Sequence, residues 1–324
     1  MNGRHLTLKI DVDTLRGTLE GVPRLLDLFD RHGLKATFLF SLGRDHTGRA
    51  LKRALRPGFF AKVQRTSVVE HYGIRTLLYG TLLPGPDIGV RGAQVMRDTG
   101  RRGHETGIHT WDHTKWQDNV RIRAARWTWR EMTLAYDRYL SIFGEAPSTH
   151  GAAGWQINDD ALRQLDTWAM AYASDGRVAD DETDRGAFRP FVGGRALDCI
   201  QIPSTLPTLD ELIGIDGRDA TGAADVLLAL TARTEGDEVF TLHAELEGMK
   251  LIDAFEHLIE GWKAQGFVLG TLAEAYARVD VASLPLRHWR WGSISGRSGE
   301  LMLGGDRVGR DAGGMKKPGA GPGS

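Results

Sequence analysis

Cysteine is almost absent from this chain of 324 residues, which contains only Cys199. A single cysteine excludes an internal disulfide and fits a reducing compartment. Cys199 lies in the apolar run 197–202, so we expect a buried side chain rather than a nucleophile. Long apolar runs are also missing, because none approaches the ~20 residues that a membrane-spanning helix needs. The N-terminus lacks the basic-then-apolar pattern of a secretory signal, and we therefore expect a cytoplasmic protein.

An excess of charge of either sign is absent as well. The formal net charge of −1 excludes a globally basic nucleic-acid binder, although it leaves room for a local basic patch. Hydrophobic residues make up 41% of the chain and charged residues 26%, which is typical of a soluble globular protein. A chain of this length buries a large core, and α/β barrels of similar size are often one domain.

Strand-like and helix-like patterns alternate along most of the chain. Leu6, Leu8, Ile10 and Val12 predict a strand with one packed face, and a helix from about residue 22 ends at Gly33. Further strands are predicted over 35–42, 104–109, 147–155, 172–175, 197–202, 238–243 and 267–269. Further helices are predicted over 92–102, 125–143, 161–169 (capped by Asp159), 223–233 and 251–265. This order predicts a parallel sheet with crossover helices, closed or nearly closed into a barrel.

Titratable side chains stand at the C-terminal ends of several predicted strands. They are Asp11 and Asp13, His109 and His113, Asp175, and His243. In barrels of this kind, functional sites lie at that end of the strands. Two histidines four residues apart are weak evidence alone, but two imidazoles and one carboxylate form a three-ligand metal set that leaves room for water. The second carboxylate is then free to act as a base.

Six motifs in this order make the chain resemble a known family. They are Ile10-Asp11-Val12-Asp13-Thr14, the loop 16–23, Gly103-His104-Glu105 before His109-Thr110-Trp111-Asp112-His113, Ala152-Ala153-Gly154-Trp155, the segment 201–208 and the segment 241–248. The chain resembles the polysaccharide deacetylase superfamily (carbohydrate esterase family 4, NodB homology) from the first strand to about residue 275. Within it, the motifs are most similar to those of the 4-deoxy-4-formamido-L-arabinose-phosphoundecaprenol deformylases.

The resemblance implies a distorted (β/α) barrel and one divalent metal ion. It suggests zinc, with manganese, cobalt or nickel as alternatives. By matching position it implies that Asp13, His109 and His113 are the metal ligands. It implies that Asp11 is the general base, that His243 is the general acid, and that Asp175 orients His243. The superfamily usually has an arginine that holds the base and a proline two residues later. His150 and Ala152 stand there instead, so the tether of Asp11 is not evident from the sequence.

Four more residues are candidates for support or substrate binding. Asp112 either orients a ligand histidine through its second nitrogen or is an exposed turn residue. Trp155 either stacks on a sugar face or covers the core, and we favour the sugar. Glu245 either binds sugar polar groups or lies in a solvated loop. Arg16, in the loop after the first strand, is predicted to bind substrate.

The implied reaction is hydrolysis of a formamide on a lipid-linked aminoarabinose precursor. Its product is the free amine used in lipid A modification and cationic-peptide resistance. Two alternatives are a deacetylase of N-acetylated glycans and a non-catalytic carbohydrate-binding relic of the fold. The full set of three ligands, base and acid argues against a relic. A facial-triad iron oxygenase expects His-x-Asp, where this chain has His-Thr-Trp-Asp.

The segment 44–89 interrupts the alternation between the second and third predicted strands. Over 49–65 it interleaves leucine and phenylalanine with basic residues and contains no acid. This pattern suits a segment at a membrane interface, and a lid packed on the barrel is the alternative. We expect Arg49, Lys52, Arg53 and Arg56 to bind an anionic surface, so that the protein lies on the inner face of the inner membrane and meets a polyprenyl-phosphate-linked sugar there.

The chain is therefore expected to have two parts. Residues 1–283 form the barrel with its insertion at about 44–89. Residues 284–324 are expected to be a largely disordered tail, because the order of strands and helices is lost there and the end is rich in glycine.

Overall fold

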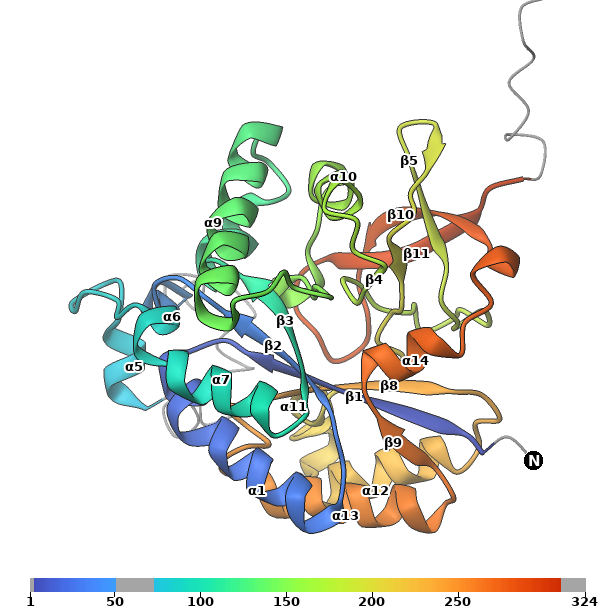
Figure 1. The fold of residues 1–324 in the computed structure, drawn as a ribbon. Coiled ribbons are helices and arrows are strands. Elements are labelled where there is room, and N and C mark those ends of the chain that lie inside the picture. Colours follow the sequence, from blue (N-terminus) through green and yellow to red (C-terminus); the bar gives the residue numbers. More distant parts are fainter. Residues whose placement is uncertain (1–2, 51–72, 310–324) are drawn as a thin grey trace, which may run out of the picture.

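A parallel sheet forms the centre of the molecule. The computed structural model describes residues 3–50 and 73–309. The strand order is β3-β2-β1-β8, and β9 pairs with the first residues of β1 (Figure 1). These strands are β1 (His5–Val12), β2 (Thr37–Ser41), β3 (Glu105–Thr110), β8 (Glu238–His243) and β9 (Val268–Gly270). β1 is hydrogen-bonded along both edges. As in any strand, its side chains alternate between two faces, here one toward the outer helices and one toward the interior.

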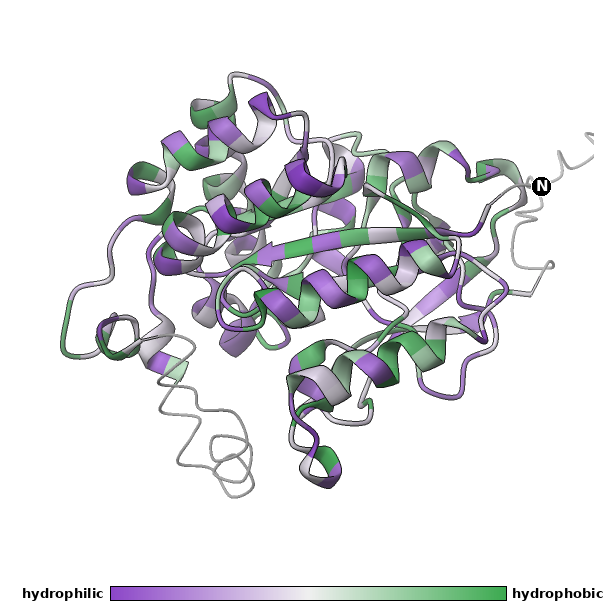
Figure 2. Ribbon diagram, turned by 90° about the horizontal axis from the view of Figure 1, so that it is seen from below, coloured by the Kyte–Doolittle hydropathy of each residue, from purple (hydrophilic) through white to green (hydrophobic). Residues whose placement is uncertain are grey.

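Amphipathic helices cover the outer face of the sheet. They are α1 (Val22–His32), α7 (Ala93–Arg101), α9 (Ala125–Phe143), α12 (Ala220–Thr231) and α13 (Ile252–Ala264), and α14 (Leu272–Ala277) follows β9. Figure 2 shows hydrophobic and hydrophilic residues alternating along the helices on the face it views. In α1, Leu25 and Phe29 pack with Leu8 and Ile10 of β1 in one buried cluster. Burial of each such side chain contributes about 2 kcal/mol. As expected, α1 ends at Gly33, whose φ of 63° is left-handed.

Backbone hydrogen bonds close the sheet into a distorted barrel. Beyond β3 the circuit continues through segment 149–151, the short strands β4 (Tyr172–Ala173) and β7 (Ile200–Gln201), and segment 204–206 back to β8. The linking bonds are Ile108 N–H to Thr149 O (3.1 Å), Ser174 N–H to His150 O (2.8 Å), Ile202 N–H to Ala173 O (2.8 Å) and Thr205 N–H to Val239 O (3.0 Å). The closed or nearly closed barrel predicted from the sequence is therefore confirmed, with short and irregular strands on the side opposite β1.

Three shorter helices lie near the rim of the barrel. They are α8 (His113–Asn119), α10 (Asp159–Thr167) and α11 (Leu209–Leu212). The predicted cap of α10 is wrong by one residue: Asn158, not Asp159, is the N-cap. Its side chain accepts a hydrogen bond from Ala161 N at 2.9 Å. Either side chain suits an N-cap, so only the geometry decides between neighbours.

The insertion after β2 is described in part. Residues 51–72 lie outside the described chain, and with them Lys52, Arg53 and Arg56. The flanking parts form a 3₁₀ turn at Thr47–Ala50, α5 (Ile74–Leu78) and α6 (Ile88–Arg91). Ile88 N–H donates to Gly43 O at 2.7 Å, which fixes the far end of the insertion beside the end of β2. Among the described helices, none combines the length and apolarity needed to cross a bilayer.

The C-terminal segment is not the disordered tail that the sequence predicted. A second sheet in the order β11-β10-β5-β6 combines β5 (Arg189–Val192) and β6 (Arg195–Ala196) with β10 (Leu286–Gly292) and β11 (Leu301–Arg307). Leu301, Met302 and Leu303 are buried, so this hairpin has a core face of its own. The prediction failed because the packing partner of the hairpin, in the expected loop 177–194, is almost a hundred residues away in sequence. Residues 310–324 lie outside the described part.

Candidate active site

The interior face of β1 brings polar side chains into the barrel. Leu8, Ile10 and Val12 pack against the outer helices, and the alternating positions Lys9, Asp11 and then Asp13 face inward. All three polar side chains are buried. Buried charges persist only where opposite charges, hydrogen bonds or metal ions compensate them, so this face of β1 is organised around a polar site.

The two histidines come from the exit of β3. His109 stands in the strand itself, and His113 is the first residue of α8. Their rings are stacked with centroids 5.3 Å apart. Asp112 is the N-cap of α8 and accepts a hydrogen bond from Lys115 N at 3.1 Å, which fixes where the helix begins. The turn between strand and helix therefore brings both rings to the same side.

Asp13 lies between these two imidazoles. His109 Nε2 is 3.2 Å from Asp13 Oδ1, and His113 Nε2 is 3.3 Å from Asp13 Oδ2. One ligand atom from each residue lies within 4.8 Å of the others. Burial raises the pKa of Asp13, but the neighbouring histidines outweigh it and leave the pKa well below its usual value. The predicted three-residue set is thus brought together by the fold.

These residues fit a divalent metal ion. Asp13 Oδ1 is buried and has no hydrogen-bond partner, so an acceptor points at the space between the histidines. His109 Nδ1 donates to Gly151 O at 2.7 Å, which leaves Nε2 as the nitrogen with a free lone pair. Two imidazole nitrogens and one carboxylate are a donor set suited to zinc and its neighbours in the first transition series.

Asp11 and His243 stand side by side on neighbouring strands. They are register partners in the pairing of β1 with β8, and Ala244 N–H donates to Asp11 O at 3.0 Å. Asp11 Oδ1 lies 3.7 Å from His109 Nδ1, close to the candidate metal ligands. The positions expected for base and acid therefore meet at the same end of the barrel.

The pKa of His243 is raised. Burial disfavours the imidazolium, but the carboxylates of Asp13, Asp210, Asp11 and Glu247 stabilise it by more. The backbone N–H of His243 donates to Glu247 Oε2 at 2.8 Å, and its Nδ1 is buried without a hydrogen-bond partner. A buried histidine surrounded by carboxylates is placed to donate a proton.

Asp175 does not orient His243, and this expectation is corrected. Its Oδ1 accepts from His150 Nδ1 at 2.6 Å and from Ala152 N at 2.9 Å, and its Oδ2 accepts from Gln201 Nε2 at 2.9 Å. Asp175 is fully buried, so these three donors satisfy it. His150, at the place of the family arginine, therefore holds Asp175 in the barrel wall.

Asp112 does not hydrogen-bond a ligand histidine either. Besides capping α8, its Oδ2 lies 2.6 Å from His46 Nδ1. The side chain is buried, which also excludes the alternative of an exposed turn residue. Asp112 supports His113 indirectly, because it fixes the first turn of the helix that carries this histidine.

Glu245 is not placed to bind a sugar, contrary to expectation. Its Oε1 accepts hydrogen bonds from Asp13 N (3.0 Å), Thr14 N (2.8 Å) and Thr14 Oγ1 (2.8 Å). Gly17 leaves room for this carboxyl group, since a Cβ there would lie 2.0 Å from Oε1. Burial and the charge of Asp13 raise the pKa of Glu245 to about 8. Glu245 therefore holds the backbone that presents Asp13.

Trp155 is a core residue, and the preferred expectation of sugar stacking is wrong. Its side chain is 1% exposed, and its Nε1 donates to Ser204 Oγ at 3.0 Å. The guanidinium groups of Arg177 and Arg297 lie 4.8 and 4.5 Å from its ring centre. A sugar cannot stack on a ring that is already covered. Its edge-to-face contact with His243, at 6.4 Å between centroids, makes it a wall of the site.

Arg16 stays a candidate for substrate binding. It lies four residues after the last residue of β1, and its Nε donates to Glu20 Oε2 at 3.2 Å. Its guanidinium is partly exposed, so it remains accessible to a substrate.

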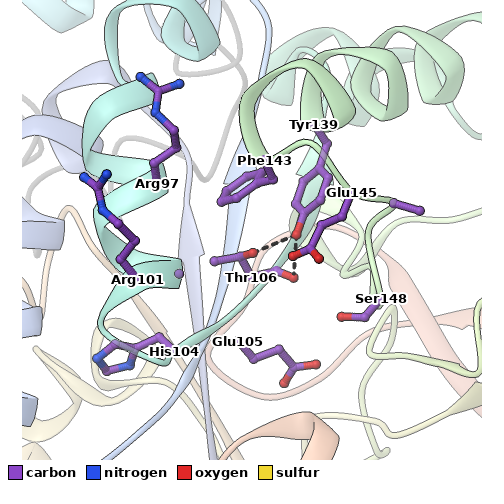
Figure 3. Close-up of a pocket in the computed structure, with 11 residues that line it drawn as sticks. Arg97, Arg101, His104, Glu105, Thr106, Tyr139, Phe143, Glu145 and Ser148 are labelled. Carbon is purple, nitrogen blue, oxygen red and sulfur yellow. Dashed lines mark hydrogen bonds between the residues drawn. The ribbon is translucent and has the colours of Figure 1, made fainter.

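A pocket lies at the other end of the barrel. It has a volume of about 520 Å³ and is lined by residues of α7, α9 and the start of β3 (Figure 3). There the hydroxyl group of Tyr139 lies 2.7 Å from Thr106 Oγ1 and 3.2 Å from the carbonyl oxygen of Thr106. Because Glu105 begins β3 and His109 is near its end, this pocket is separate from the candidate metal site.

Two residues that contact the candidate site residues escaped the sequence analysis. Lys9 carried a signal, because it occupies the same alternating face as Asp11 and Asp13. His46 carried none, since its partner Asp112 is 66 positions away in the chain.

Comparisons with known proteins agree with this geometry. The family profile of polysaccharide deacetylase matches residues 4–173. A protein of Shewanella sediminis (strain HAW-EB3), named as a probable 4-deoxy-4-formamido-L-arabinose-phosphoundecaprenol deformylase, is 36% identical over 300 residues, which are 93% of this chain and 94% of that protein. A Wigglesworthia glossinidia brevipalpis protein with the same name is 28% identical over 87% of this chain and 96% of its own.

The fold is also shared with a protein of known structure. A Mycobacterium smegmatis protein assigned to the polysaccharide deacetylases superposes with a TM-score of 0.60 at 15% identity, over 90% of this chain and 96% of that chain. At this identity the likeness shows the fold alone, which is the distorted (β/α) barrel of NodB homology. With the profile match and the 36% identity, it shows that the chain belongs to the polysaccharide deacetylase family.

Proposed function

We propose that the protein is a metal-dependent amide hydrolase that removes the formyl group from a 4-formamido-arabinose carried on undecaprenyl phosphate. The observation that carries the proposal is the convergence of Asp13, His109 and His113 beside Asp11 and His243 at one end of the barrel. The relatives named as deformylases, which span nearly the whole chain, supply the substrate class. The released free amine then serves in lipid A modification.

Each side chain has a defined task in this proposal. Asp13, His109 and His113 would hold one divalent ion, with zinc as the first candidate. When bound, the ion polarises the formyl oxygen and lowers the pKa of water. Asp11 accepts the proton of the attacking water, because its carboxylate lies beside the candidate ligand His109, with 3.7 Å between Oδ1 and His109 Nδ1. His243 donates a proton to the departing nitrogen, since an amine leaves poorly until it is protonated.

A formate-release assay tests the proposal. Purified protein, stripped of metal and reloaded with zinc, manganese, cobalt or nickel, is given the formamido-arabinose lipid and its N-acetyl counterpart. We expect formate release that depends on metal, and acetate release that is slower by at least about 100-fold. Faster acetate release would make the protein a deacetylase. Stoichiometric metal without hydrolysis of either amide would make it a non-catalytic member of the fold.

We also propose that the insertion places the protein on the inner face of the inner membrane. Of the four basic residues expected at the surface, Arg49 is described, and its Nε donates to Gly80 O at 3.0 Å. Around it, Ile74, Leu82 and Val90 are exposed, with Leu82 at 81%. Exposed apolar side chains next to cations suit an anionic bilayer surface, where each cation contributes about 1 kcal/mol.

Vesicle co-sedimentation tests the membrane proposal. The wild type is expected to pellet with anionic vesicles, to stay in solution with zwitterionic ones, and to be released by salt. Arg49→Glu, Lys52→Glu, Arg53→Glu and Arg56→Glu together are expected to abolish binding at unchanged metal content. Arg97→Glu with Arg101→Glu on α7, outside the insertion, is the charge-reversal control. Equal binding by the fourfold variant and the wild type would refute this surface.

A further inference from the structure

A cation lies beside Asp11, and it is not the arginine that usually holds this carboxylate in the superfamily. His150, at the place of that arginine, bonds Asp175 instead. The ammonium group of Lys9 lies 3.7 Å from Asp11 Oδ1, two residues earlier on the same face of β1. This is ion-pair distance, and Oδ1 has no hydrogen-bond donor of its own in the structure.

Lys9 is held rigidly inside the barrel. Its side chain is 0% exposed, and its Nζ donates to Ser174 O at 2.9 Å across the interior. Gly151 makes room for the stem: a Cβ at that position would lie 3.1 Å from Lys9 Cε and 2.3 Å from Leu39 Cδ1. The Nζ is also 5.4 Å from the centre of the Trp155 ring. The ammonium therefore has one fixed position, with donors left for Asp11.

Packing does not account for a lysine at this position. Removing an ammonium group from water costs several kcal/mol, and an apolar side chain of similar length would fill the same space without that cost. Burial lowers the pKa of Lys9; the carboxylates of Asp11 and Asp175 oppose this in part by stabilising the ammonium, and Arg177 acts in the same direction as burial. The carboxylate of Asp11, 3.7 Å away, is the charge partner that this lysine has on its own strand.

We infer that Lys9 is the positioning residue of Asp11. Its ammonium fixes Oδ1 from the barrel interior, so that the carboxylate keeps one orientation toward the metal ligands. In this chain a lysine of β1 takes the task that an arginine of another strand has in the superfamily. The inference deepens the proposed function, on which it rests for the role of Asp11.

Substitutions at Lys9 separate charge from packing. Lys9→Met keeps the stem, Lys9→Gln offers an uncharged donor, and Lys9→Arg keeps a cation. For Lys9→Met and Lys9→Gln we expect kcat to fall about 10- to 100-fold with KM within about twofold, because misplacement of a base affects the chemical step. Lys9→Arg is expected to recover most of kcat. The control is Thr241→Val on β8, which removes an interior hydrogen bond between Thr241 and Ser204. It is expected to lower the melting temperature at unchanged kcat.

A double-mutant cycle identifies the partner through which Lys9 acts. In an Asp11→Asn background, Lys9→Met is expected to change the residual rate by less than about twofold. The same 10- to 100-fold loss in both backgrounds would overturn the inference, as would wild-type kcat in Lys9→Met. Lys9→Gln takes its place in the cycle if Lys9→Met does not fold.

A structural readout keeps the inference testable if the wild type hydrolyses no amide, in which case the proposed function fails separately. In a crystal structure of zinc-loaded Lys9→Gln, the Asp11 carboxylate is expected to rotate away or lose its single conformation, with full metal occupancy. An Asp11 carboxylate that stays in place would overturn the positioning role.

Discussion

The two ends of β3 carry one buried histidine each, and they differ in almost everything else. His109 lies at the end of the strand beside Asp11 and Asp13, and His104 immediately precedes its first residue. Both rings are at least 95% buried. His109 Nδ1 donates to a carbonyl, whereas His104 Nδ1 accepts from Ala36 N–H at 3.2 Å. The same residue type in one strand is thus a ligand candidate at one end and a core residue at the other.

Their pKa values move in opposite directions. Burial lowers the pKa of both, but Asp11 and Asp13 more than reverse the effect at His109. At His104, burial and the positive charge of Lys35 act together and lower the pKa to about 4. Phe29 and Phe38 pack against this neutral ring. Neighbouring carboxylates, rather than burial or a nearby pocket, distinguish a site histidine from a structural one.

The largest effect is expected on metal content and activity, from substitutions at the metal end of β3. His109→Ala and His113→Ala are each expected to remove most bound metal and to lower activity by about 1,000-fold or more, because one of three ligands is lost. The matched control at the other end is His104→Phe, which is expected to keep both metal and activity. Elemental analysis and formate release measure the outcome. Stoichiometric metal in the double alanine variant would disprove the ligand assignment.

A smaller loss of turnover is expected for variants that keep the metal but lack the general base or the general acid. Asp11→Asn keeps the shape of the side chain without a basic oxygen, and His243→Ala removes the acid. Each is expected to lower turnover by about 100-fold or more at near-normal metal content. Wild-type turnover in either variant would remove that residue from its proposed role. His104→Phe, assayed alongside, shows the effect of losing a histidine outside the site.

Local patterns were enough to predict that four of the candidate residues lie at one end of the barrel. Alternation in β1 and the spacing of the strands predicted a barrel, and the strand ends brought Asp11, Asp13, His109 and His243 together. Both features depend on residues close in sequence, since strand parity and helix periodicity are local. The same parity included Lys9, which was overlooked because a lysine is normally expected at the surface.

Partners distant in sequence could not be predicted in the same way. Asp175 pairs with His150 at a separation of 25 residues, and Glu245 with the backbone of Asp13 at 232. A polar residue near a site looks the same in sequence whether it faces substrate or backbone. Trp155 is covered partly by Arg297, from the segment expected to be disordered. Only the packed fold distinguishes these cases.

A moderate effect on metal affinity is expected from substitution of Glu245, which holds the backbone of Asp13. Glu245→Ala removes the acceptor that holds Asp13 N and Thr14 N, so metal affinity is expected to fall about 10- to 100-fold. Glu245→Gln keeps a carbonyl oxygen at this place and is expected to retain affinity. Competition with a fluorescent chelator measures both. A raised KM with unchanged metal affinity in Glu245→Ala would instead restore the role of sugar recognition.

The smallest effect concerns the contribution of His104, just before the start of β3, to the free energy of unfolding. The pKa of His104 falls from 6.5 to about 4 on folding, so between these values the unfolded chain binds a proton that the folded protein excludes. The contribution of His104 to the free energy of unfolding is therefore fully present above pH 6.5. It declines as the pH falls and is lost near pH 4, by about 3 kcal/mol at most. His104→Phe keeps an aromatic ring between Phe29 and Phe38 but cannot titrate.

The difference between wild type and His104→Phe isolates this contribution. Urea unfolding of both metal-free proteins at pH 7, 6, 5 and 4 gives the two free energies, and titrations elsewhere cancel in their difference. At pH 7 the variant is less stable, because the buried N–H of Ala36 loses its acceptor. That deficit is expected to shrink or reverse toward pH 4. A difference independent of pH would mean that His104 takes up its proton equally in both states, and the contrast between the two ends of β3 would then not extend to protonation.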